Sequence, residues 1–205
     1  MIGEKENRMG VMPVGKLLFS MSTPMVISFL VQSLYNIVDS IFVARYSPDA
    51  LAAVSLAYPI QILMIAVSVG TGVGVNALLS RLLGEGKKER AKVTADNAVL
   101  LAIMASIAFA IFGAIATKAF FDAQTNSESI RSLGYSYLSI VSIFSFGLIL
   151  EVTYERILQS TGKTIYNMIT QGIGAIINII LDPILIFGLL GAPKMGVAGA
   201  AIATV

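Results

Sequence analysis

Long apolar stretches alternate with short charged breaks along the whole chain. Uncharged runs occupy residues 17–38, 50–80, 97–117, 132–150 and 164–181. Each run is near or above the roughly 20 residues that a helix needs to cross about 30 Å of hydrocarbon. With flanking residues, the pattern predicts membrane-spanning helices at about 17–44, 50–80, 95–117, 132–152, 164–190 and, cut short, 195–205.

This spacing favours an all-α fold, a polytopic bundle of transmembrane helices that takes in the whole chain, residues 1–205. A transmembrane barrel would instead show strands of about ten residues with alternating polarity. The composition agrees, since 56% of the residues are hydrophobic and only 13% are charged. The mean hydropathy of +0.83 also lies outside the range of ordinary soluble domains.

The composition also narrows the chemistry. The sequence has no cysteine and no histidine, which excludes disulfides, thiolate nucleophiles, imidazole metal sites and histidine bases. A net charge of +2 without a concentrated basic face gives no support to a nucleic-acid partner. We therefore expect no enzyme, no metal site and no organic cofactor.

Lysine and arginine are distributed unevenly between the two sides of the predicted bundle. With the N-terminus inside, the cytoplasmic segments would hold ten of the 14 basic residues, namely Lys5, Arg8, Lys16, Arg81, Lys87, Lys88, Arg90, Lys92, Arg156 and Lys163. The other side would hold Arg45, Lys118, Arg131 and Lys194. Because cytoplasmic loops carry the positive excess, we expect a cytoplasmic N-terminus and several spans in the inner or plasma membrane of a cell. The basic turn "SRLLGEGKKERAK" is expected to be solvated or to face lipid headgroups.

The first span carries an aspartate, Asp39. A carboxylate near the bilayer centre costs at least about 2.5 kcal/mol, so it usually faces a cavity or a partner. Gln32, Tyr35 and Asn36 precede Asp39 at helical spacing, which predicts one polar face. The alternative is that Asp39 lies at the outer interface, six residues before Arg45, and only hydrates the helix end.

The fifth span repeats this arrangement in "NIILDPILIFG", where Asn178 and Asp182 are four residues apart and share a helix face. With the N-terminus inside, both spans run outward and both acids lie in the outer half. If they face a common cavity, the two carboxylates would repel each other when ionised, so the pair could carry a proton. The sequence leaves open whether the two spans touch.

Two further features have competing interpretations. Pro24 in the first span removes a backbone hydrogen bond and is expected to kink the helix, either as a hinge or as a static bend. Pro183 is expected to loosen the fifth span beside Asp182. Glu151 and Glu155 could line the inner mouth of a cavity or lie at the interface beside Arg156.

Several linked motifs carry a family resemblance. They are Pro24 in the first span, "NIVDSIFVAR" at its outer end, "ALAAVSLAYPI", "RLLGEGKKERA", "ILQSTGKT", "NIILDPILIFG" and "GVAGAAIAT". In order and spacing the chain resembles the prokaryotic branch of the multidrug and toxic compound extrusion (MATE) family over essentially its whole length.

The resemblance implies a twelve-helix antiporter of two six-helix lobes that exports cationic, amphipathic small molecules by alternating access, driven by protons or sodium ions. Its coupling acids fall on Asp39 and Asp182, their aromatic and amide neighbours on Tyr35 and Asn178, and its helix-one proline on Pro24. The chain stops in the sixth helix. It is therefore expected to be an N-terminal lobe, either a fragment of a longer protein or a lobe that pairs with another chain, whose missing partner is the C-terminal lobe.

Three functions compete at this stage. The leading one is multidrug efflux coupled to a cation, with the acid pair favouring protons over sodium ions and with Asn36 and Gln32 in the polar shell. A flippase for lipid-linked oligosaccharides of the same superfamily would need arginines in its cavity to hold phosphates, and none lies in the predicted spans. The third is a non-transporting membrane assembly or sensor module whose acids only bind partner helices. Membrane lipids are expected partners in every case.

Overall fold

The computed structural model describes residues 12–205, and in this part of the chain every regular element is a helix. Lys5 and Arg8, which contribute to the predicted orientation, lie outside the described residues. Four helices are long and apolar enough to cross a membrane: α2 (Val14–Tyr46), α3 (Pro48–Gly84), α4 (Lys88–Ile115) and α8 (Thr164–Phe187). The predicted all-α membrane bundle is confirmed.

The shorter elements complete the bundle. They are α5 (Thr117–Gln124), α6 (Glu128–Ile143), α7 (Phe146–Ser160), the 3₁₀ turn η1 (Leu189–Gly191) and α9 (Val197–Thr204). The sequence predicts one span at 132–152, but the structure has α6 and α7 there, joined at an angle of 44°. Phe144 leaves helical geometry, and the amides of Ser145 and Gly147 bond carbonyls three residues back, so the ordinary ladder is interrupted. The bent pair counts as a fifth span if both halves cross together.

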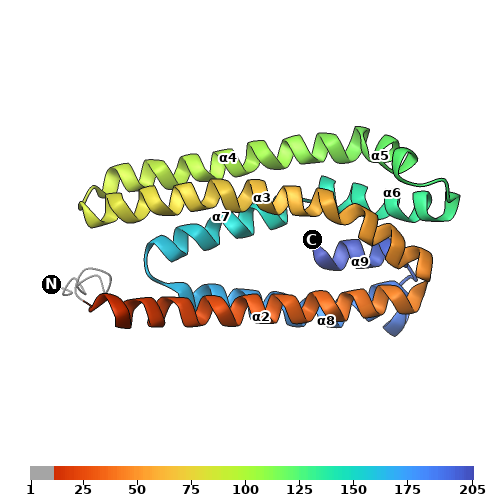
Figure 1. The fold of residues 1–205 in the computed structure, drawn as a ribbon, viewed down its shortest axis with the longest axis horizontal. Coiled ribbons are helices and arrows are strands. Elements are labelled where there is room, and N and C mark those ends of the chain that lie inside the picture. Colours follow the sequence, from red (N-terminus) through yellow and green to blue (C-terminus); the bar gives the residue numbers. More distant parts are fainter. Residues whose placement is uncertain (1–11) are drawn as a thin grey trace.

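The helices form two layers, which Figure 1 shows at the top and the bottom of the view. The lower layer is α2 and α8, which run side by side in the same direction and form the most extensive helix pair of the described chain. The upper layer consists of α3, α4, α6 and α7. α9 lies between the layers and packs against α6 on one side and α8 on the other.

Local chemistry places the connections between the long helices. The hydroxyl of Ser47 accepts a hydrogen bond from the Asp49 amide at 3.1 Å, and Pro48 follows it in the first helical position, so Ser47 alone separates α2 from α3. α8 ends at Phe187 and is capped by Gly188, whose φ of 74° is the left-handed conformation that glycine allows. The chain then folds back, and the amide of Met195 bonds the carbonyl of Leu185 at 2.9 Å, which sets α9 against α8.

The larger part of the core lies at the end where α2 meets α3. Its buried members include Val43, Met64, Phe121, Tyr137 and Ile186. Val43 is the one buried residue of α2, whereas α8 buries six, namely Thr164, Asn167, Ala175, Asn178, Asp182 and Ile186. α8 is therefore held far more firmly than α2, which leaves most of its apolar surface open.

The two ends of the bundle differ in charge. Figure 1 shows that the start of α2, the α3–α4 turn and the α7–α8 connection lie at one end, whereas the α2–α3 turn, α5 and η1 lie at the other. The basic residues assigned to the cytoplasm from Lys16 onward belong to the first group of segments. The charge asymmetry is thus a property of the fold, and the side that faces the cytoplasm remains a prediction.

Candidate functional site: an acidic pair between α2 and α8

The structure brings Asp39 and Asp182 together. α2 and α8 pack along each other, and the two carboxyl groups lie in direct interaction range. Asp182 is fully buried and Asp39 is half-buried. Ionised carboxylates only accept hydrogen bonds, so this contact becomes a hydrogen bond only when one of the two groups holds a proton.

The oxygens of this pair lack donors. Within the described chain, Oδ1 of Asp39 and both carboxylate oxygens of Asp182 are buried without a hydrogen-bond partner. Asn178, one turn before Asp182, donates from Nδ2 to the carbonyl of Ala203 on α9 at 3.1 Å, and its own Oδ1 is also unpartnered. Buried polar atoms normally find partners, so four orphaned acceptors in one place suit a proton or a small cation.

The polar residues of α2 divide into two groups. Tyr35 and Gln32 are half-buried and lie next to each other. Tyr35 is also close enough to both aspartates to interact with their charges. Asn36 is exposed instead, on the part of α2 that faces away from the packed surface. The face predicted from spacing therefore includes Gln32, Tyr35 and Asp39 in the structure, with Asn36 at its outer rim.

Sequence reasoning missed a polar group on the opposite layer. Tyr137 of α6 is buried, its hydroxyl accepts a hydrogen bond from Gln61 of α3 at 3.1 Å, and it lies near both aspartates and Thr204. The sequence did contain a signal for this group. Gln61 and Tyr137 lie inside apolar predicted spans, where a polar side chain usually has a partner or a function. The acidic pair on α2 and α8 thus has residues of α6 and α9 close to it.

The structure places the remaining predicted residues farther away. α2 continues through Pro24, which is half-buried and 15 residues before Asp39, or about 22 Å along the helix axis. Glu151 and Glu155 on α7 face α8, where Nε2 of Gln171 donates to them at 3.4 and 3.0 Å. Arg156, also in α7, donates instead to Gln159 at 2.8 Å.

No metal-binding cluster of three or more acidic, histidine or cysteine side chains occurs in residues 12–205. The two aspartates therefore form a pair rather than part of a larger carboxylate site. The chemistry available to this pair is the binding and release of one proton or one small cation.

Known proteins resemble this chain in sequence. The "FAD transporter" of Shewanella oneidensis is 32% identical over 192 residues, which cover 94% of this chain and 42% of that protein. "Probable multidrug resistance protein YoeA" of Bacillus subtilis is 30% identical over 183 residues, which cover 89% of this chain and 40% of that protein. The chain spans about two fifths of the length of these relatives.

Solved structures resemble it in fold. A MOP superfamily transporter from Pyrococcus furiosus superposes with a TM-score of 0.90 at 29% identity over 100% of this chain and 44% of that one. An outward-facing MATE family multidrug resistance transporter superposes with a TM-score of 0.86 at 31% identity, over 92% of this chain and 41% of that one. The sequence profile of the MatE family matches residues 24–184, a stretch that contains the acidic pair. This multi-pass membrane protein therefore belongs to the MatE family of transporters.

Proposed function

We propose that the chain is the N-terminal lobe of an exporter that moves cationic, amphipathic small molecules in exchange for a cation, with Asp39 and Asp182 as the coupling site. The observation that carries the proposal is the set of four buried, unpartnered oxygens of Asp39, Asn178 and Asp182. A complete exporter would pair this lobe with a second one, because alternating access needs two bundles that rock against each other.

Protons are the coupling ion that we favour. A proton on either aspartate would turn two repelling carboxylates into a hydrogen-bonded pair and would tighten α2 against α8. A sodium ion would instead need the aspartate oxygens together with Oδ1 of Asn178, since hard cations bind oxygen ligands. The two ions can be distinguished at Asn178, because Asn178→Leu should abolish sodium coupling and spare proton coupling.

Conformational coupling would run through α2. This helix buries only Val43, so its packing depends on the contact with α8 that protonation changes. Pro24 interrupts the backbone hydrogen bonding of α2 and would serve as the hinge that lets one part of the helix move. If it does, Pro24→Ala should lower export, whereas Pro183→Ala in the firmly packed α8 should have a smaller effect; equal effects would remove the hinge role.

One relative favours a second candidate substrate class. The "FAD transporter" is 32% identical to this chain, and FAD carries a pyrophosphate that a cationic side chain would hold. Arg156 would suit such a substrate, because its Nε is buried without a partner. Export of FAD that fails in Arg156→Gln, with drug export unchanged, would support this candidate.

The coupling role is tested in cells that express the complete transporter. Asp39→Asn and Asp182→Asn should each reduce drug resistance and substrate-induced proton release by at least about tenfold, because the amide cannot take up and release a proton. Asp122→Asn is the control, since Asp122 is an exposed acid in α5 that pairs with Arg131 at 3.2 Å. Normal proton exchange in both aspartate variants would remove the carrier role.

A further inference from the structure

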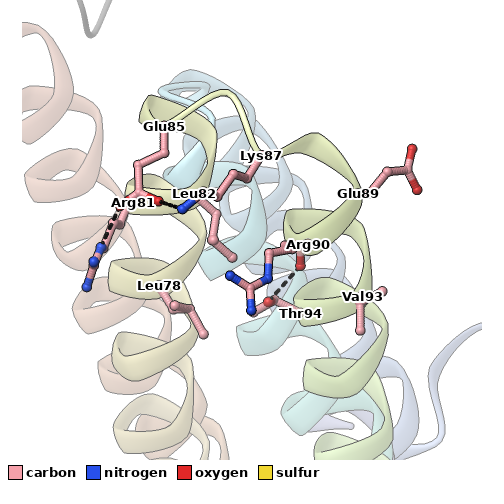
Figure 2. Close-up of a pocket in the computed structure, with 9 residues that line it drawn as sticks. All are labelled: Leu78, Arg81, Leu82, Glu85, Lys87, Glu89, Arg90, Val93 and Thr94. Carbon is pink, nitrogen blue, oxygen red and sulfur yellow. Dashed lines mark hydrogen bonds and ion pairs between the residues drawn. The ribbon is translucent and has the colours of Figure 1, made fainter.

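We propose that the groove between the end of α3 and the start of α4 binds the phosphate headgroup of an anionic membrane lipid. The groove has a volume of about 520 Å³ and lies at the α3–α4 turn (Figure 2). Cationic, acidic and apolar residues share its lining, together with one threonine: Arg81, Lys87, Arg90, Glu85, Glu89, Leu78, Leu82, Val93 and Thr94. The proposal is independent of the acidic pair, which lies toward the other end of the bundle.

Two of the three cations share one carboxylate. Glu85 accepts from Nε of Arg81 at 2.8 Å and from Nζ of Lys87 at 2.6 Å. The hydrogen bond from Lys87, followed by that from Arg81, lowers the pKa of Glu85 to about 2, so this carboxylate stays ionised at neutral pH. These three residues form a rim held by two ion pairs, with one positive charge left over between the two cations.

Arg90 is the cation that remains available. Within residues 12–205, its guanidinium forms no ion pair with an acidic side chain. Figure 2 shows the guanidinium directed from α4 across the groove toward α3, while the neighbouring Glu89 points away from the groove. A guanidinium presents a planar fork of donors that matches two oxygens of a phosphate.

The start of α4 adds to this attraction. α4 begins at Lys88, and no side chain caps its first turn. The uncapped amides and the helix dipole carry partial positive charge at that end of the helix. An anion beside Arg90 would therefore also be favoured by the helix that presents Arg90.

The apolar wall indicates a lipid rather than a soluble phosphate. Leu78 on α3 is 47% exposed and Val93 on α4 is 57% exposed, on the two helices that continue from here as membrane spans. A groove at this level lies between headgroups and hydrocarbon, where basic residues between helices bind anionic lipids. Acyl chains would cover Leu78 and Val93, whereas a free phosphate would leave both in water.

The test measures lipid binding to the purified protein in detergent by native mass spectrometry. The probes are phosphatidylglycerol and phosphatidylcholine with identical acyl chains, and inorganic phosphate as a competitor. Phosphatidylglycerol should bind more tightly than phosphatidylcholine, and Arg90→Gln should weaken phosphatidylglycerol binding by about fivefold. Lys92→Gln is the matched control, because this exposed lysine lies outside the groove on the same helix and should change binding by less than about twofold.

Three outcomes would overturn the assignment. They are equal losses in Arg90→Gln and Lys92→Gln, equal binding of the two lipids, and displacement of phosphatidylglycerol by an equal concentration of inorganic phosphate. Circular dichroism of each variant shows whether the helices are intact. Arg90→Lys is a further variant that keeps the charge but loses the fork, and it should retain part of the affinity.

Discussion

At one end of the bundle the carboxylate of Asp182 is fully buried and unpartnered, whereas at the other end Glu85 is exposed and bound by two cations. The same functional group is thus held in two opposite ways. A carboxylate that is already paired with two fixed cationic side chains gains little from binding a proton or a free cation. A buried carboxylate without donors gains strongly from any proton or cation that reaches it. The comparison shows a buried carboxylate without donors at one end of the lobe and an exposed, paired carboxylate at the other.

The two helices of the lower layer, α8 and α2, also differ from each other. α8 is fastened to α9 by the hydrogen bond of Asn178 and by close packing at Gly199. α2 has only one buried residue, and its main contact is α8 itself. We infer that α8 is the fixed side of the acidic pair and α2 the side that can move.

The largest expected effect is on the attachment of α8 to α9. A Cβ at Gly199 would lie 2.6 Å from the carbonyl carbon and oxygen of Leu185, so Gly199→Ala must push the two helices apart. We expect a loss of about 2 kcal/mol in stability, measured as the unfolding midpoint in detergent.

Gly174→Ala is the control for that variant. Gly174 lies on α8 with no atom within 4 Å of its would-be Cβ. Alanine there should raise the midpoint, since glycine inside a helix costs up to about 1 kcal/mol relative to alanine. The same chemical change should thus have opposite signs at the two positions. A midpoint that falls equally in both variants would show that close packing at Gly199 is not what fixes α9.

A smaller effect is expected at Tyr137, which closes the buried end from the opposite layer. Tyr137→Phe keeps the ring in the core but removes the acceptor of the Gln61 hydrogen bond. We expect a loss of about 1 kcal/mol in stability by the same measurement. Tyr58→Phe on α3 should be neutral, because Tyr58 is 58% exposed.

A double variant separates the hydrogen bond from other changes at Tyr137. With Gln61→Leu already present, the further change Tyr137→Phe should cost much less, since the donor has gone. An unchanged cost in that background would contradict the role assigned to the bond.

Much of this arrangement could be predicted from the sequence, for definite physical reasons. Hydropathy places α2, α3, α4 and α8, because a membrane span must satisfy its backbone internally and present apolar side chains to lipid. The high cost of a charge in hydrocarbon singles out Asp39 and Asp182 in the same way.

Features that depend on contacts between distant segments could not be predicted. The break at Phe144 lies beside Ser145 and Gly147, but such residues also occur in unbroken membrane helices and did not predict it. Asn178 can donate to Ala203 only because α9 folds back against α8. Helical spacing alone could predict only that Asn178 shares a helix face with Asp182. Tyr137 and Gln61 meet only because α3 and α6 are neighbours. Asn36 lies within about 60° of both Gln32 and Asp39 around the helix, too small an angle for a spacing pattern to decide.

The smallest effect is expected at the exposed end, where the comparison can be sharpened by pH. The pKa of Glu85 is lowered from 4.5 to about 2, so its ion pairs contribute stability that is fully present above pH 4.5. That contribution is lost as the pH falls through about 2, when the folded state also takes up the proton. Glu85→Gln should therefore reduce the pH dependence of the unfolding midpoint between pH 4.5 and 2, and should leave the midpoint at pH 7 slightly lower. Screening by water keeps this change below those at Gly199 and Tyr137.

Glu89→Gln, whose carboxylate points away from the groove in Figure 2, should leave the profile unchanged. If the two variants have the same profile, the rim formed by Glu85 is not fixed, and the contrast with Asp182 is one of burial alone.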